Sequence, residues 1–210
     1  MLAYIFWHRP LDACAIDAYE RAQVVFHRSL ARTPPVGFHG SAVFRIANLP
    51  WPWSAAAAQE RLPPDDGPGY EDWYLVEDYT ALGVLNEAAV GRGHRTAHDA
   101  VANRFGAGAG GLYGLLEGLR PPPLAEASLA VWVARPPGSR QRALGDLLGD
   151  GIDPRHASLW RRQFVFGPAP EYCLLAPGQA ERNQPAGVSA TRLPEGWTAT
   201  LFAREVLFDG

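Results

Sequence analysis

The sequence predicts an α+β protein whose two halves repeat one pattern of strands and helices. Short apolar segments typical of strands alternate with segments that show helical spacing. A proline-rich segment, residues 120–123, separates two such series. The second series starts with LAVWVARP at 129–136, which is similar to LAYIFWHRP at 2–10. Because internal similarity indicates duplication, we expect a first repeat over residues 1–119 and a shortened second repeat over 124–210.

The elements of the first half follow from apolar patterning and helix-capping residues. Asp17 and Glu20 have the spacing of a capping box, and an apolar stripe with helical spacing follows them. The prolines at 34 and 35 end that helix, because proline cannot continue the backbone ladder. In chain order we expect a strand at 2–9, a helix at 17–32, strands at 38–47 and 71–79, a helix from Asp78 or Thr80 to Val90, a helix at 96–105 and a strand at 111–118.

The second half shows the same order of elements with one helix fewer. In place of the second helix we expect a loop at 177–196. The remaining elements are a strand at 129–135, a short helix at 139–149 and strands at 159–166, 171–176 and 198–208.

Two irregular segments interrupt the first half. The segment 49–69 contains Trp51 and Trp53 among several prolines, and a loop of this length in a compact domain is usually functional. The two tryptophans favour either a lid over a pocket or an arm that packs on a partner subunit. The run GAGAGG at 106–111 follows a helix and leads into a strand, the reverse of the order in a dinucleotide-binding motif. It therefore indicates a flexible connection or the end of a helix.

The basic residues exclude several reaction classes. All 19 residues in the Lys+Arg count are arginine. Without lysine the chain cannot contain a Walker phosphate loop, the lysine pair of a protein kinase, or a Schiff base with a substrate or pyridoxal phosphate. Guanidinium is the only fixed side-chain cation at neutral pH. An anionic ligand must therefore be bound by arginine, histidine, backbone amides or a metal.

The charge and the cysteine content indicate which partners and which cellular compartment to expect. The net charge is −3 and the isoelectric point about 6.1, and the arginines are scattered, so we expect no nucleic-acid partner. Cys14 and Cys173 are isolated; one bridge between them stays open, but two free thiols in a reducing cytosol are the simpler interpretation. The apolar segment 1–7 is too short for a membrane helix and lacks the basic start of a signal peptide. We expect a cytoplasmic protein without a membrane partner.

The element order strand-helix-strand-strand-helix-strand is that of the ferredoxin-like unit. Two such units in one chain would form a pseudo-twofold α+β barrel. In this respect the chain resembles the dimeric α+β barrel superfamily, which includes EthD-like proteins, antibiotic-biosynthesis-type monooxygenases, haem-degrading monooxygenases and chlorite-dismutase-like proteins. The resemblance depends on the element order, on the aromatic first strand ending in His8-Arg9-Pro10, and on the third strand running into residues 76–82. It implies a small organic ligand, no tightly bound nucleotide, and a pocket between the two sheets.

The candidate catalytic residues lie on or near strand 38–46. Alternation places His39, Ser41, Val43 and Arg45 on one face, which either lines a cavity or faces solvent. The resemblance implies a cofactor-independent oxygenase or isomerase in which His39 or His27 accepts a proton and Arg45 or Arg9 stabilises an oxyanion. Tyr74, with Trp51 and Trp53, is the expected pocket or lid residue.

Other combinations of residues give weaker predictions. His94 and His98 are four residues apart but lack a third ligand, so they are more typical of two surface histidines than of a metal site. Haem bound by His27 is a further alternative, although chlorite-dismutase-like proteins take that ligand from the second repeat. The adjacent carboxylates Glu71 and Asp72 are interpreted as solvated charge. No Gly-x-Ser-x-Gly elbow of a serine hydrolase occurs.

The sequence thus predicts a protein that binds a small organic ligand and leaves open whether it is an enzyme. The main alternative is a non-catalytic binding or assembly protein that uses the aromatic loop, with homo-oligomerisation as one form of assembly. An enzyme requires a base near an acceptor in one cavity, whereas an assembly protein requires a contiguous apolar patch.

Overall fold

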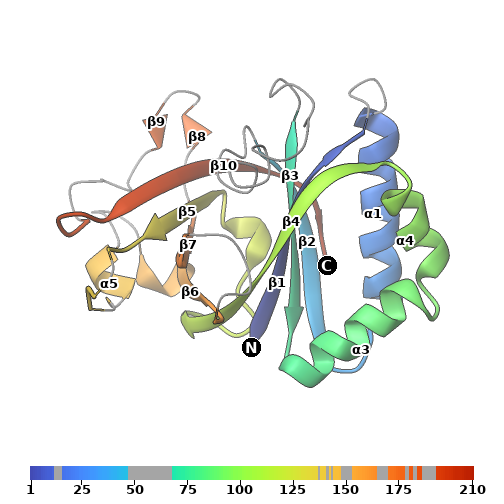
Figure 1. Cartoon of the computed structure of the whole chain (residues 1–210), viewed down its shortest axis with the longest axis horizontal. Helices are drawn as coiled ribbons and strands as arrows, with labels where there is room; N and C mark the ends of the chain where they lie inside the picture. The colour runs from blue at the N-terminus through green and yellow to red at the C-terminus, as the bar shows by residue number, and fades with distance from the viewer. Residues whose placement is uncertain are drawn as a thin grey trace.

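An antiparallel barrel with helices against one side forms the described part of the chain in a computed structural model (Figure 1). The structure describes residues 1–11, 16–46, 68–136, 138–140, 142, 144–147, 153–164, 170–177, 180–181, 184–185 and 193–210. The elements are β1 (Leu2–Pro10), α1 (Ile16–Arg32), β2 (Phe38–Ile46), β3 (Gly69–Val76), α3 (Tyr79–Val90), α4 (Arg95–Ala102), β4 (Phe105–Glu117), η2 (Leu124–Glu126), β5 (Leu129–Ala134), α5 (Leu144–Leu147), η3 (Pro154–His156), β6 (Ser158–Arg162), β7 (Tyr172–Ala176), β8 (Ala180–Glu181), β9 (Gln184–Pro185) and β10 (Thr198–Asp209).

Eight of these strands close the barrel in the order β1-β3-β2-β10-β5-β7-β6-β4. Every pair of neighbours is antiparallel. The strands of the first half form one arc, β4-β1-β3-β2, and those of the second half form the other, β10-β5-β7-β6. The arcs join where β2 pairs with β10 and where β4 pairs with β6. The division into repeats over 1–119 and 124–210 stays a prediction.

The predicted fold class, two ferredoxin-like repeats forming a pseudo-twofold α+β barrel, is wrong. The described chain is mostly sheet, closed into one eight-stranded antiparallel barrel. Its helices of eight residues or more, α1, α3 and α4, all belong to the first half. In the second half, the described part of the segment 139–149 contains one helix, the four residues of α5.

Most of the predicted strands and helices occur, although the predicted fold class is wrong. The strands expected at 2–9, 38–47, 71–79, 129–135, 159–166, 171–176 and 198–208 all occur, with shifted ends. Helix α3 begins as predicted, because Asp78 is its N-cap and accepts a hydrogen bond from the Ala81 amide. The glycine run at 106–111 is not a connection or a helix end but part of β4. The loop residues Trp51 and Trp53 lie outside the described residues, as does Cys14.

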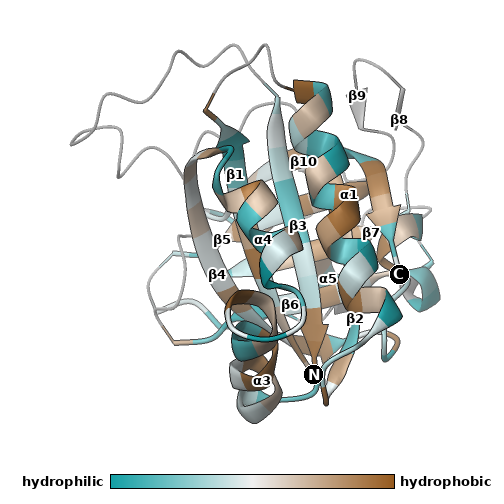
Figure 2. Ribbon diagram, turned by 90° about the vertical axis from the view of Figure 1, so that its right-hand side faces the viewer, coloured by the Kyte–Doolittle hydropathy of each residue, from teal (hydrophilic) through white to brown (hydrophobic). Residues whose placement is uncertain are grey.

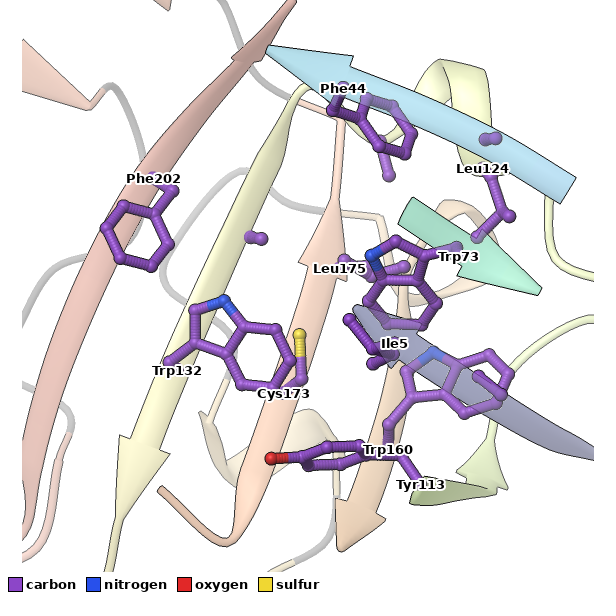
Figure 3. Close-up of a cluster of buried hydrophobic side chains, with 14 of the residues drawn as sticks. Ile5, Phe44, Trp73, Tyr113, Leu124, Trp132, Trp160, Cys173, Leu175 and Phe202 are labelled. Carbon is purple, nitrogen blue, oxygen red and sulfur yellow. The ribbon is translucent and has the colours of Figure 1, made fainter. Parts of the chain in front are cut away.

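Aromatic side chains fill the inside of the barrel. Trp73, Trp132 and Trp160 point into this shared interior (Figure 3), and each is at most 1% exposed. Trp73 and Trp160 meet edge to face with ring centres 5.4 Å apart. Cys173, a free thiol, is buried in the same cluster. Side chains therefore occupy the space between the two arcs, where the resemblance implied a ligand pocket.

One ion pair lies within this aromatic interior. Glu71 on β3 and Arg204 on β10 are each completely buried, and Glu71 Oε1 is 3.3 Å from Arg204 Nε. The indole N–H groups of Trp7 and Trp73 donate hydrogen bonds to the Glu71 carboxylate at 2.9 and 2.7 Å. The Arg204 guanidinium lies 3.3 Å from the centre of the Phe44 ring. Burial lowers the pKa of Arg204, although Glu71 opposes this shift.

The helices cover the outer face of the first arc, as Figure 2 shows for α1, α3 and α4 in front of the strands. A second apolar cluster fills part of the space between helices and strands, including Phe26 and Leu30 of α1 and Leu85 of α3. None of the described helices is long and apolar enough to span a bilayer. This cluster does not fill the whole space between the helices and the strands, and the space that remains is the candidate functional site.

Candidate functional site

A cavity of about 690 Å³ lies between the outer face of the first arc and the three helices. It opens to solvent beside α3, where the lining residues Tyr79 and Val90 are about half exposed. Its walls are mainly apolar, and its polar groups come from α1, α3, α4, β1 and β3. The lining residues are Tyr4, Phe6, Gln23, Phe26, Asp72, Tyr74, Tyr79, Leu82, Gly83, Leu85, Asn86, Ala89, Val90, His98, Val101, Ala102 and Phe105.

Glycines of β4 make room for the aromatic rings that line this cavity. A Cβ at Gly110 would lie only 2.5 Å from the phenol oxygen of Tyr4. A Cβ at Gly108 would lie 2.7 Å from ring atoms of both Phe6 and Phe105. Tyr4 and Phe6 can therefore lie across β4 only because no side chain stands there. The glycine run shapes the cavity wall, a role that its sequence pattern did not reveal.

The enclosed end of the cavity carries a buried carboxylate, Asp72, which is 2% exposed. The Tyr74 hydroxyl donates a hydrogen bond to Asp72 Oδ2 at 3.1 Å. Nε2 of His27 lies 3.4 Å from the same oxygen, and Nε2 of His8 lies 3.1 Å from Oδ1. His8 Nε2 is thus within ion-pair distance of Oδ1. Asp72 is thus held by two imidazoles and one phenol.

His27 is hydrogen-bonded at both ring nitrogens. Its Nδ1 lies 2.8 Å from Ser41 Oγ, and its Nε2 lies 3.0 Å from the Tyr74 phenol oxygen. Ser41, His27 and Asp72 therefore form a chain like that of a serine hydrolase. Ser41, however, is 1% exposed and is not among the cavity-lining residues. A nucleophile must reach its substrate, so this chain orders the tyrosine and the carboxylate and does not transfer acyl groups.

His8 is held from the α1 side. Its Nδ1 lies 2.6 Å from the Tyr19 phenol oxygen, and its Nε2 lies 3.3 Å from Gln23 Nε2. If Tyr19 donates to Nδ1, then the neutral tautomer carries its proton on Nε2, the nitrogen nearest Asp72. Tyr19 and Gln23 are one helical turn apart on the buried face of α1, which aligns both with β1 and β3.

The buried network moves the pKa of Asp72 and of the tyrosine in opposite directions. Burial by itself raises the pKa of Asp72, but the positive charges and hydrogen bonds of His8 and His27 outweigh burial. They hold the pKa of this carboxyl well below its ordinary value. Burial, reinforced by the Asp72 charge, raises the pKa of Tyr74 well above its ordinary range. Near neutral pH the pair is therefore a carboxylate beside a neutral phenol.

The structure brings together only part of the predicted site. Tyr74 lines the cavity, and His27 lies directly behind it. His39 is exposed on β2 and does not line the cavity. Arg45 is bound to Glu20 of α1 through two hydrogen bonds, at 2.8 and 2.7 Å, so its face of β2 is covered by a helix. Arg9 is buried and does not line the cavity either. Neither arginine is placed to stabilise an oxyanion in this cavity.

The histidines considered for metal or haem binding have other partners. His94 is buried, not on the surface as predicted, with Nδ1 3.0 Å from Ser29 Oγ and Nε2 3.1 Å from the Thr33 carbonyl oxygen. His98 lines the cavity and lies beside Asp99. The described residues contain no cluster of three metal-binding side chains. Since both ring nitrogens of His27 are hydrogen-bonded, the arrangement does not support His27 as a haem ligand.

Sequence reasoning missed the central residue of the site. Glu71 and Asp72 were predicted to be solvated, but both are buried, because alternation along β3 sends them to opposite covered faces. Gln23 was also missed, although a signal was present. On α1 it shares the buried face with Tyr19, Phe26 and Leu30, so a polar residue interrupts an apolar stripe.

Comparisons with known proteins add no family to this description. No protein-family model matches the chain, and no curated protein matches it in sequence.

Proposed function

We propose that the protein binds a small, largely apolar organic ligand in the cavity between the first arc and its helices. The observation that carries this proposal is an apolar cavity of about 690 Å³ that meets a buried, ordered polar group, Asp72 with Tyr74. Ligand sites are typically concave and apolar with a few placed polar groups, and their volumes fall in this range. A cytoplasmic location is part of the proposal and is supported by the isolated cysteines.

An acid–base reaction at this site is the second candidate. It is favoured by the hydrogen bonds that join Asp72, Tyr74 and His27, which resemble a proton-transfer chain. The directions of the two pKa shifts argue against acid–base catalysis as the main function. A carboxyl with a lowered pKa is a weak base, and a phenol with a raised pKa is a weak acid. The same groups are well suited to hold a ligand in one orientation, so we place binding before catalysis.

Gly83 offers a way to test the cavity directly. It lines the cavity from α3, and a Cβ added there would meet no atom within 4 Å. N-phenyl-1-naphthylamine, an uncharged dye that fluoresces in apolar surroundings, should bind with a saturable increase in fluorescence and a stoichiometry near one. Gly83→Trp should reduce its affinity by at least tenfold, because the indole enters the space that the dye needs. Fluorescence titration measures both values.

Gly83→Ala is the matched control for this variant. It adds only a methyl group and should keep the dye affinity within about twofold. It should also raise stability by about 0.5–1 kcal/mol, because alanine is favoured over glycine inside a helix. The proposed function fails if the dye does not saturate, or if both variants bind it as well as the unaltered protein.

A further inference from the structure

We infer that the protein has a second binding site, a groove that takes a phosphate group, either free or at the end of a small phosphomonoester. The groove has a volume of about 360 Å³. It lies where the last turns of α1 meet the residues just before α4, and these two helices are neighbours (Figure 2). It shares no lining residue with the cavity of the proposed function. Its charge, its hydrogen-bond donors and its shape point to this ligand.

Two arginines of α1 give the groove a positive charge. Arg28 and Arg32 line it one helical turn apart. Neither guanidinium forms a hydrogen bond or an ion pair with any residue that the structure describes. α1 has no acidic residue after Glu20 that could pair with them, and like charges at this spacing destabilise a helix. The C-terminal end of α1 carries about half a negative charge, which offsets less than one of the two guanidiniums.

The carboxylates of the neighbouring helices have other partners. Glu87 of α3 has its Oε2 2.5 Å from Arg92 Nη2, and Asp99 of α4 has its Oδ2 3.4 Å from Arg95 Nε. The described residues that line the groove include no carboxylate. The positive charge of the groove is therefore left to ions from solvent or to an anionic ligand.

His94, on the wall of the groove, is held in a way that fits a third positive charge. Its Nε2 lies 3.1 Å from the carbonyl oxygen of Thr33, which only accepts, so Nε2 carries a proton. Its Nδ1 lies 3.0 Å from Ser29 Oγ, and the Ser29 hydroxyl donates its proton to the Phe26 carbonyl oxygen at 2.7 Å. Nδ1 can then bond Ser29 only by donating as well. A histidine that donates from both ring nitrogens is an imidazolium.

The donors and the shape of the groove favour phosphate over a carboxylate. A guanidinium binds phosphate through two parallel hydrogen bonds, and a phosphomonoester carries about 1.5 to 2 negative charges at pH 7, against one for a carboxylate. Thr33 adds an exposed hydroxyl to the lining. At Gly93 a Cβ would meet no atom within 4 Å, so the groove is open there, and Val25 offers an exposed apolar surface to an organic group. The volume lies near the lower end of the range for small-molecule sites, which fits a small ester.

Nuclear magnetic resonance on the ¹⁵N-labelled, unaltered protein tests the inference. Inorganic phosphate is added at pH 7.5, with sodium chloride adjusted to keep the ionic strength constant, so that general screening does not change. We expect saturable shifts of the backbone amide signals of Ser29, Thr33 and Gly93. Acetate should bind at least about tenfold more weakly, because it carries one charge instead of two. Phenyl phosphate then separates the two sources of the group: tighter binding than inorganic phosphate assigns the site to a monoester, and weaker binding assigns it to free phosphate.

Variants of the two arginines test the assignment to α1. Arg28→Gln and Arg32→Gln should each weaken phosphate binding by about fivefold or more, because each removes one charged fork, and the double variant should show no saturable shifts. Both positions are exposed, and glutamine has nearly the helix propensity of arginine, so the fold should be kept. Arg21→Gln is the matched control, since it removes the same charge from an exposed position of α1 outside the groove. Its phosphate affinity should stay within about twofold of that of the unaltered protein.

Three results would overturn the inference. The first is a phosphate titration without saturable shifts at the groove. The second is acetate binding as tightly as phosphate, which would remove the preference for a doubly charged group. The third is a loss of affinity in Arg21→Gln as large as that in Arg28→Gln, which would mean that phosphate follows the general charge of α1. Dye binding in the cavity tests the proposed function separately, because the two sites share no lining residue.

Discussion

Glu71→Ala is expected to lower the free energy of unfolding by about 3–5 kcal/mol, because it leaves the charge of Arg204 buried without its counter-ion. The substitution also removes the acceptor for the indole N–H groups of Trp7 and Trp73. Each of these donors would then be unsatisfied inside the barrel, at a further cost of about 1–3 kcal/mol in the least favourable case. Urea denaturation followed by tryptophan fluorescence and by circular dichroism measures the change.

Two further variants separate the charge from the hydrogen bonds. Glu71→Gln keeps an acceptor for one or both indoles but removes the charge, so it should be intermediate. The double substitution Glu71→Leu with Arg204→Met removes both charges and should recover much of the lost stability, because an ion pair replaced by apolar groups of similar volume is often neutral or stabilising. If Glu71→Ala costs less than 1 kcal/mol, then the pair does not hold β3 to β10 as the structure indicates.

Local features of the chain were predictable because their causes are local. Asp78 precedes a helix and caps it, and the alternation in β2 separates the face of Ala42, Phe44 and Ile46 from the opposite face. Which of the two faces turns to the barrel interior was not predicted, because the opposite face was expected at a cavity or in solvent and lies under α1 instead. Closure of the barrel has no such local cause. It depends on β2 meeting β10 and on β4 meeting β6, and these pairs join segments far apart in the chain.

The candidate site shows the same limit at the level of single residues. His27 and Tyr74 could be selected because each is a chemically capable residue within a predicted element. Asp72 could not be assigned to the site from the sequence. Its neighbour Glu71 is also acidic, and two adjacent acidic residues are solvated unless both faces of their strand are covered, as they are in β3. The cavity was predicted inside the barrel. Four tryptophans fill that interior, and the cavity lies outside, where glycines of β4 leave space.

Asp72→Ala is expected to cost about 3–5 kcal/mol of unfolding free energy at pH 7. The change leaves the imidazoles of His8 and His27 without the buried carboxylate that both of them face, and it leaves the Tyr74 hydroxyl without the oxygen that accepts its hydrogen bond. Tyr74→Phe removes only that hydroxyl and should cost about 1 kcal/mol, which makes it the matched comparison. Thermal and urea unfolding measure both variants. Equal losses of unfolding free energy for the two variants would contradict the conclusion that the Asp72 carboxylate is the main stabilising group of this network.

The stabilisation by Asp72 should also depend on pH in one direction. Its pKa in the folded protein lies below its pKa in the unfolded chain, near 4, so the unfolded chain takes up the proton first as the pH falls. The contribution of Asp72 is therefore complete above about pH 5 and is lost as the pH falls below 4. Asp72→Asn lacks this contribution at every pH. The difference in unfolding free energy between the unaltered protein and Asp72→Asn should consequently shrink from pH 6 to pH 3. A constant or growing difference would mean that the two histidines do not lower the pKa of this carboxyl.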